Sequence, residues 1–266
     1  MKKILFALFI FTYALGFSQI DKLNSKEPLV KDPYFKKETN VAVQPGQKVR
    51  FIHSDLFERK ADMYGGNPFF TGNVQFEHQG AMLTADRVIF YEKENFAKAI
   101  GNVLLVTSDG NRITSNEMEY DGNTQRGIAR GKVVLTDAKQ TISTDVLYYD
   151  RVKNTAYFNS GGTINDGRNT MWTQSATYFI DSKTNEFTNN YTIDNAQYRV
   201  EGKNIKHYQN TNIAEFFGPT TIINKEKPSN YVYTENGKYL MNEKQVYLNK
   251  NSRIYYNGKI LKGDKM

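Results

Sequence analysis

The sequence contains no cysteine, and that absence excludes two devices that many exported proteins use. Without a thiol there is no lipoprotein acylation site, and without a pair of thiols there is no disulfide framework. Proline is scarce as well, with 6 in 266 residues. Because proline interrupts the hydrogen-bond ladder of a sheet, its scarcity permits long strands. A folded domain of this chain has to be held together by its core and its hydrogen-bond ladders.

Long apolar runs are missing beyond the first 18 residues. There, two lysines precede an apolar run from Ile4 to Phe17 that ends in small residues. This is the pattern of a secretory signal peptide, and a run of about 14 residues falls short of the ~20 that a membrane-spanning helix needs. We therefore predict a signal peptide over residues 1–18 and a mature chain that begins near Gln19 in the periplasm.

Neither a concentrated charge nor a metal-ligand pattern is present. The formal net charge is +7, but the lysines and arginines are scattered, so the footprint of a nucleic-acid binder is missing. A mild attraction to a phosphate-bearing lipid remains compatible with this charge. His53, His78 and His207 lack the spacing that gathers metal ligands, and we expect exposed or cross-strand histidines. We predict no metal, no cofactor and no nucleic-acid partner.

Aromatic residues are abundant, with 18 Tyr and 17 Phe, and they favour a strand-rich chain. Residues 19–46 are different, because they are polar, carry Pro28, Pro33 and Pro45 and show no sustained periodicity. We interpret them as a flexible lead-in with one edge strand at Asn40 to Val43.

A repeat of about 30 residues dominates the rest of the chain. The segment Leu83-Thr-Ala85-Asp86-Arg-Val88-Ile-Phe90-Tyr91 returns four times, and its small residue falls at positions 85, 115, 144, 173 and 202, in steps of 30, 29, 29 and 29. A second anchor, usually glycine, follows 16 residues later, as at Gly101 and Gly131. Each repeat has room for two strands and two turns, which predicts a stacked, all-β array.

The apolar phase changes inside the repeat. Leu83 and Ala85 share one face of a strand, whereas Val88 and Phe90 are in phase with Asp86. Because side chains alternate between faces, a shift of one residue implies a bend or bulge at that point. A bend in every repeat predicts a sheet that folds over into a V.

One polar position recurs beside this bend, occupied by Asp86, Asn116, Asp145, Gln174 and Lys203. The two carboxylates among these residues are compatible with the acid/base pair of a glycosidase. Their replacement by amides and a lysine argues instead for a structural, turn-capping role. Since no nucleophile triad or phosphate-binding glycine loop is present either, we predict that the chain is not an enzyme.

An apolar stripe is the remaining candidate for function. The simpler interpretation is a sandwich core, and the sharper one is a trough that shelters acyl chains. A chain of a dozen methylenes gains on the order of 10 kcal/mol on leaving water, at about 0.8 kcal/mol per CH₂. The candidate lipid-binding residues are Val74, Phe76, Leu83, Val88, Phe90, Val103, Ile113, Met118, Tyr120, Val133, Ile142, Leu147 and Tyr149.

The sequence resembles the organic-solvent-tolerance (OstA) family, which includes the periplasmic lipopolysaccharide-transport bridge protein. The resemblance rests on the period of 29 to 30 residues, on the motif that begins at Leu83 and on the units Gly72-Asn73-Val74 and Gly101-Asn102-Val103. The resemblance covers about Val49 to Met266. It implies an open-ended antiparallel β-jellyroll, or β-taco, that binds the acyl chains of lipid A. It also implies edge-to-edge β contacts with other jellyroll components of the bridge or with a second copy of this chain.

The chain departs from the compact bridge protein in its long lead-in and extra repeats. The motif restarts at Leu261-Lys-Gly263-Asp264. We therefore expect the jellyroll of residues 47–266 to continue beyond 266. One alternative is an exported β-solenoid adhesin or structural scaffold, whose core would be closed and free of lipid. A glycan-cleaving solenoid is a third possibility.

Overall fold

The computed structural model describes residues 48–266, so the predicted signal peptide, the lead-in and its edge strand at Asn40 to Val43 lie outside the described residues. The described part is almost entirely β, apart from the one-turn 3₁₀ helix η2 (Tyr64–Gly66). Its strands are β1 (Arg50–His53), β2 (Leu56–Glu58), β3 (Phe69–His78), β4 (Ala81–Tyr91), β5 (Phe96–Val106), β6 (Arg112–Asp121), β7 (Arg126–Thr136), β8 (Thr141–Asp150), β9 (Thr155–Phe158), β10 (Gly162–Asn165), β11 (Thr170–Phe179), β12 (Thr184–Asp194), β13 (Tyr198–Tyr208), β14 (Ile213–Asn224), β15 (Tyr231–Leu240), β16 (Gln245–Lys250), β17 (Ser252–Tyr256) and β18 (Lys259–Gly263).

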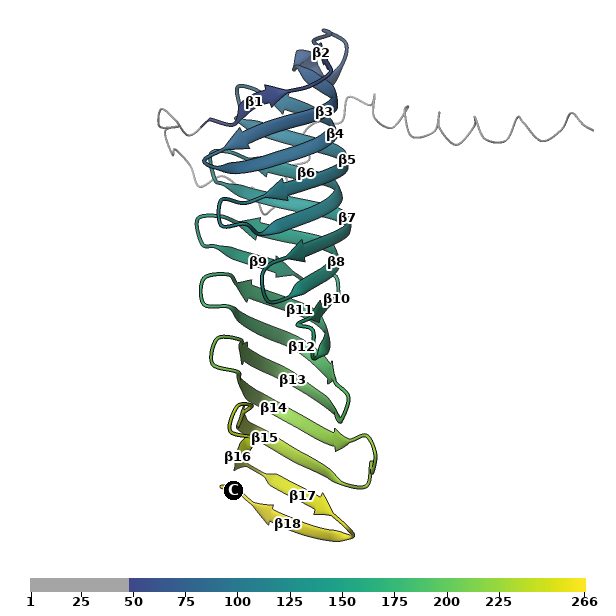
Figure 1. Cartoon of the computed structure of the whole chain (residues 1–266), viewed down its shortest axis with the longest axis vertical. Coiled ribbons are helices and arrows are strands. Elements are labelled where there is room, and N and C mark those ends of the chain that lie inside the picture. The colour runs from purple at the N-terminus through teal and green to yellow at the C-terminus, as the bar shows by residue number, and fades with distance from the viewer. Residues whose placement is uncertain (1–47) are drawn as a thin grey trace, which may run out of the picture.

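These strands form one antiparallel sheet that runs along the long axis of the molecule (Figure 1). Each full-length strand pairs with the next strand along the chain, and three pairs of short strands each act as the two halves of one long strand. Thus β1 and β2 both pair with β3, β9 and β10 both lie between β8 and β11, and β16 and β17 both pair with β15. Each repeat contributes two strands, as predicted.

The sheet bends near the middle of nearly every full-length strand and forms two arms. In β4 the register shifts between Thr84 and Arg87, so residues 81–84 lie in arm 1 and residues 87–91 lie in arm 2. The V predicted from the phase shift is therefore present. The turns at the free end of arm 1 form rim 1, which comprises residues 79–80, 107–111, 137–140, 166–169, 195–197, 225–230 and 257–258. The turns at the free end of arm 2 form rim 2, which comprises residues 92–95, 122–125, 151–154, 180–183, 209–212 and 241–244.

Two consecutive left-handed residues form the corner of β5. Gly101 has φ 78° and Asn102 has φ 44°, and the Asn102 side-chain amide donates to Asp86 Oδ2 at 2.9 Å. A Cβ added to Gly101 would lie 2.4 Å from that same oxygen, so only glycine lets the carboxylate approach. Asp86 thus has the structural, capping role that the sequence predicts for this position of the repeat.

We expect Gly101→Ala to destabilise the fold by about 2 kcal/mol or more, because the new methyl group meets Asp86 and the backbone stays left-handed. Gly110→Ala is the matched control, since Gly110 has φ 86° but nothing within 4 Å of the added Cβ. Urea unfolding of both variants separates the two effects. Equal losses would mean that backbone strain alone, and not the corner contact, makes Gly101 necessary.

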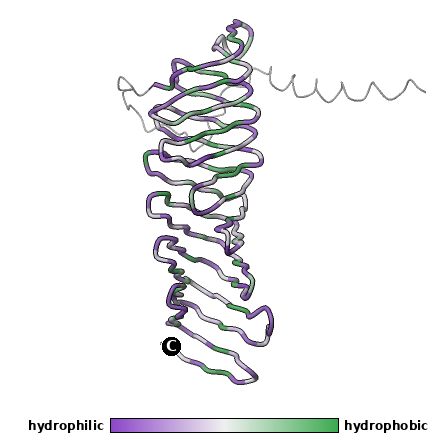
Figure 2. Tube along the Cα trace, viewed as in Figure 1, coloured by the Kyte–Doolittle hydropathy of each residue, from purple (hydrophilic) through white to green (hydrophobic). Residues whose placement is uncertain are grey.

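The inner faces of the two arms share one hydrophobic core. Figure 2 shows apolar residues along the strands and polar residues at the turns. None of the described residues belongs to a helix with the length and apolarity needed to cross a bilayer.

Candidate functional site

The predicted apolar stripe lies on the inner faces of the two arms. All thirteen candidate residues belong to the single core cluster, or pack against it, and twelve of them are no more than 5% exposed. Phe90 is the exception, because it is partly buried against that cluster. The structure therefore brings the whole predicted set together between the arms.

The stripe also continues beyond these thirteen residues. Later strands add Met171, Tyr178, Phe187, Ile205 and Phe216 to the same core. The sequence signal for them was the repeat itself, which drifts in its last copies but keeps the inward positions apolar.

Over the first strands, the chain's own side chains fill the space between the arms. The internal void lined by Val49, Phe76, Leu83 and Tyr120 measures about 10 Å³. A void of that size is at the lower limit for a single water molecule and far too small for an acyl chain. A ligand can therefore enter this region only if the arms move apart.

Hydrogen bonds between the two rims keep the mouth of the V shut, and we call this line of contacts the seam. Near its start, His78 Nδ1 on β3 lies 2.8 Å from the Tyr120 hydroxyl on β6. Arg151 on rim 2 donates to the carbonyl oxygens of His78 and Gln79 at 3.0 and 3.1 Å. Burial raises the pKa of Tyr120, so its hydroxyl stays protonated in this contact.

Asp137 on rim 1 holds the middle of the seam. Its carboxylate accepts hydrogen bonds from the Tyr178 hydroxyl and from Lys183 Nζ, the latter at 2.9 Å, both on the opposite side of the mouth. Although burial pushes the pKa of Asp137 upward, these bonds and the turn amides outweigh it and keep the pKa below its ordinary value. The pKa of Tyr178 rises through burial and through the same carboxylate.

Amide side chains extend the seam beyond Asp137. Gln140 on rim 1 exchanges hydrogen bonds with Asn185 on β12 and accepts another from Gln209. Lys139 Nζ donates to Asn210 Oδ1 on rim 2 at 3.0 Å. Turn residues of the two rims are therefore latched to one another from β3 to the turn after β13.

After Asn210, the hydrogen bonds that the structure shows between turns connect neighbours on one rim only. Asn212 bonds Asn242 on rim 2 at 2.9 Å, and Lys227 bonds Asn257 on rim 1 at 2.6 Å. Inward residues such as Ile222 and Tyr239 are partly exposed here. The mouth is thus unlatched toward β18.

Two of the three histidines lie along the seam. His207 marks the point where the latching ends, and burial lowers its pKa while Asp166 on rim 1 opposes that shift. Its Nδ1 atom is buried without a hydrogen-bond partner among the described residues. His53 is exposed on β1, with Nε2 3.6 Å from Asp55. Residues 48–266 contain no cluster of three His, Asp or Glu side chains that could hold a metal ion.

Comparison with known proteins gives four findings. A family model described as OstA-like protein matches residues 46–203, and one described as lipopolysaccharide-assembly, LptC-related, matches residues 173–260. A crystal structure of LptH, the LptA homologous periplasmic component of the lipopolysaccharide transport device from Pseudomonas aeruginosa, is similar over 40% of this chain and 80% of that chain, with 13% sequence identity and a TM-score of 0.37. No curated protein sequence matches the chain.

Proposed function

Because the chain belongs to the OstA-like protein family, we propose that it is a periplasmic, non-catalytic carrier for lipopolysaccharide on its way to the outer membrane. The observation that carries this proposal is the continuous apolar interior, which runs from Val49 to Met241 behind a mouth that hydrogen bonds and ion pairs latch only from β3 to the turn after β13. Acyl chains would lie between the arms, and the saccharide would leave through the mouth.

The free energy needed to part the two arms and the free energy gained by binding an acyl chain between them are of similar size. Roughly ten hydrogen bonds cross the seam, and each contributes about 1 kcal/mol net. Parting the arms also exposes the inner faces to water. An acyl chain covers those faces again and contributes about 0.8 kcal/mol per buried methylene, or on the order of 10 kcal/mol for a dozen. Lipid can therefore replace the contacts that the two arms make with each other.

The unlatched end is where this exchange would begin, because no cross-rim bond has to break there. The excess positive charge of the described chain also lies there. From Lys225 to Met266, 9 Lys and Arg against 4 Asp and Glu give 9 − 4 = +5, whereas residues 48–224 carry 19 against 20, or −1. A positive end favours a lipid that bears phosphates.

The open edges of the sheet are the proposed sites for partners. At the first edge, Phe51, Leu56 and Phe57 are exposed on β1 and β2. An exposed sheet edge offers unpaired backbone groups to another strand, which suits edge-to-edge pairing with another jellyroll component or with a second copy of this chain.

A photo-crosslinking amino acid at Tyr239 is expected to form adducts with lipopolysaccharide, because Tyr239 faces the interior near the unlatched end. The same group at Tyr247 is the matched control, since Tyr247 pairs through β16 with the same strand but lies on the outer face under Lys238. Mass spectrometry of the irradiated protein measures the lipopolysaccharide adducts at both positions. Equal labelling at the two positions, or none at either, would contradict carriage in the interior.

The closed region between β3 and β13 favours a second candidate, an exported scaffold or adhesin whose core never opens. The self-filled interior is the specific observation behind it. This candidate predicts that the purified protein carries no lipid and takes up none, so the crosslinking experiment separates the two functions.

A further inference from the structure

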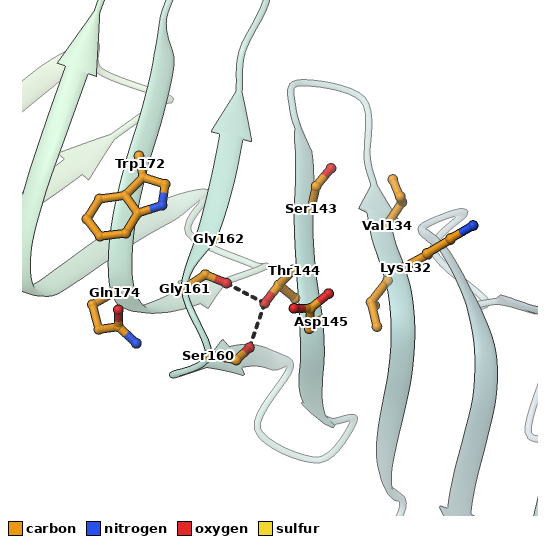
Figure 3. A pocket seen from close by; sticks show the side chains of 11 residues that line it. Lys132, Val134, Ser143, Thr144, Asp145, Ser160, Gly161, Gly162, Trp172 and Gln174 are labelled. Carbon is orange, nitrogen blue, oxygen red and sulfur yellow. Dashed lines mark hydrogen bonds between the residues drawn. The ribbon is translucent and has the colours of Figure 1, made fainter.

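A hollow on the outer face of arm 1 lies on the other side of the sheet from the interior (Figure 3). It measures about 540 Å³, is broadly open to solvent and lies where β9 and β10 interrupt the regular strand. Ligand sites commonly occupy about 300–1,000 Å³. The size of the hollow is therefore that of a binding site rather than of a packing defect.

The hollow arises from a change in the repeat. Ser160 stands where Gly101 and Gly131 form the left-handed corner in other repeats, and Gly161 stands where they carry Asn102 and Lys132. Serine does not take the left-handed conformation here, and residues 159–161 leave the ladder. Gly161 then places no side chain between β8 and β11, which leaves a bare floor.

Hydrogen bonds from both neighbouring strands hold this floor in place. Thr144 Oγ1 donates to the Gly161 carbonyl at 2.7 Å and lies 2.9 Å from Ser160 Oγ, as the dashed lines in Figure 3 show. On the other side, Gln174 Nε2 donates to the Asn159 carbonyl at 3.0 Å. The hollow is thus a preformed feature and not a loose loop.

One wall of the hollow carries Trp172, the single tryptophan of the chain, which is 46% exposed. Other repeats have Thr84, Thr114 and Ser143 at this position. A half-exposed indole on a β surface gives a flat, rigid apolar face with little side-chain entropy to lose on binding.

The carboxylate of Asp145 lies on β8, on the other side of β10 from this ring, and is left free. Asp86, its equivalent, accepts a hydrogen bond from Asn102, but the residue 16 positions after Asp145 is Gly161, which has no side chain. In the part of the chain that the structure describes, neither Asp145 nor Lys132 on the opposite wall has a side-chain hydrogen bond or an ion pair. A free acceptor and a free donor therefore lie on the side of the hollow opposite the apolar face.

We propose that this hollow binds a pyranose unit of a glycan. The apolar C–H face of one sugar ring would stack on Trp172, and hydroxyl groups of this and neighbouring units of the glycan would bond Gln174, Asp145 and Lys132, which together offer both donors and acceptors. A cationic ligand fits less well, because Lys132 opposes it. This site goes beyond the carriage of acyl chains, since it faces away from the interior.

Titration followed by tryptophan fluorescence tests the proposal directly, because Trp172 is the only emitter of its kind. The probes are chitotriose, maltotriose and the lipid-free saccharide of lipopolysaccharide, which distinguish a cell-wall-type glycan from a lipid-linked one. At least one of them is expected to shift the emission saturably, with a Kd of about 1 mM or tighter.

Asp145→Ala is expected to weaken that binding about tenfold or more, the effect of one lost charged hydrogen bond. Glu201→Ala, on the same outer face but away from the hollow, should leave it unchanged, and Trp172→Ala should abolish it in calorimetry. No response to any saccharide, or a response to tetramethylammonium alone, would overturn the proposal. Lipid crosslinking at Tyr239 should be the same in Asp145→Ala as in the unaltered protein, so the two proposals fail independently.

Discussion

A short bismaleimide that joins cysteines introduced by Lys139→Cys and Asn210→Cys is expected to abolish lipopolysaccharide uptake. The two side chains meet across the mouth at 3.0 Å, so the crosslink fixes rim 1 to rim 2 beside the unlatched end. Since the interior from β3 to β13 is already filled, lipid that enters at the unlatched end cannot then part the arms in that region. We expect at least a tenfold loss of bound fluorescent lipopolysaccharide, which is measured in a binding assay with the crosslinked protein.

The chain's lack of cysteine makes this experiment clean, because the introduced thiols are the only ones. The matched control is Asn212→Cys with Asn242→Cys, whose side chains meet at 2.9 Å on rim 2 alone. That crosslink ties neighbouring turns and leaves the mouth free, so uptake should persist. Undiminished uptake in the protein crosslinked between 139 and 210 would show that lipid does not pass through the seam.

Asp137→Ala is expected to lower the free energy of unfolding by about 3 kcal/mol. The Asp137 side chain is fully buried, and its loss leaves the Lys183 ammonium and the Tyr178 hydroxyl without their shared acceptor. The matched control is Asp181→Ala, because Asp181 accepts a bond from Asn154 on the same rim and is exposed, so its loss should cost less than about 0.5 kcal/mol. Urea unfolding of both variants gives the comparison.

The same residue predicts an acid-sensitive seam. The folded-state pKa of Asp137 is below its ordinary value of 3.8, so its contribution to stability is fully present above that unfolded-state pKa and is lost as the pH falls through the folded-state pKa. The stability difference between the unaltered protein and Asp137→Asn should therefore shrink as the pH falls below about 4. A difference that stays constant down to pH 2 would show that the carboxylate's charge contributes nothing to the seam.

The local pattern of the sequence predicts much of this fold. The phase shift between Ala85 and Asp86 marks the corner, and the strand bounds follow the turn residues. The corner bond also recurs near the end of the array, since the Asn251 side-chain amide donates to Glu235, 16 residues earlier, as Asn102 does to Asp86. These features depend on residues within one repeat or in adjacent repeats, where periodicity carries information.

The seam could not be predicted in the same way. Tyr178 and Asp137 are 41 residues apart, and Arg151 and His78 are 73 apart. Such pairs lie in or next to turns, where the apolar periodicity of the strands gives no information. Their members meet only because the two arms close. The break between β9 and β10 escaped prediction too, although Ser160 in place of the corner glycine was its visible cue.

Sequence separation also sets the order in which these contacts form. Each strand pairs with its neighbour across a short turn, whereas the seam joins residues that are two or more turns apart. Because loop closure is costly before distant contacts form, hairpins assemble early and the seam late. Weakening a late contact mainly speeds unfolding and leaves the folding rate nearly unchanged. Residues such as Asp137 therefore govern how long the closed molecule lasts, and not how quickly it is made.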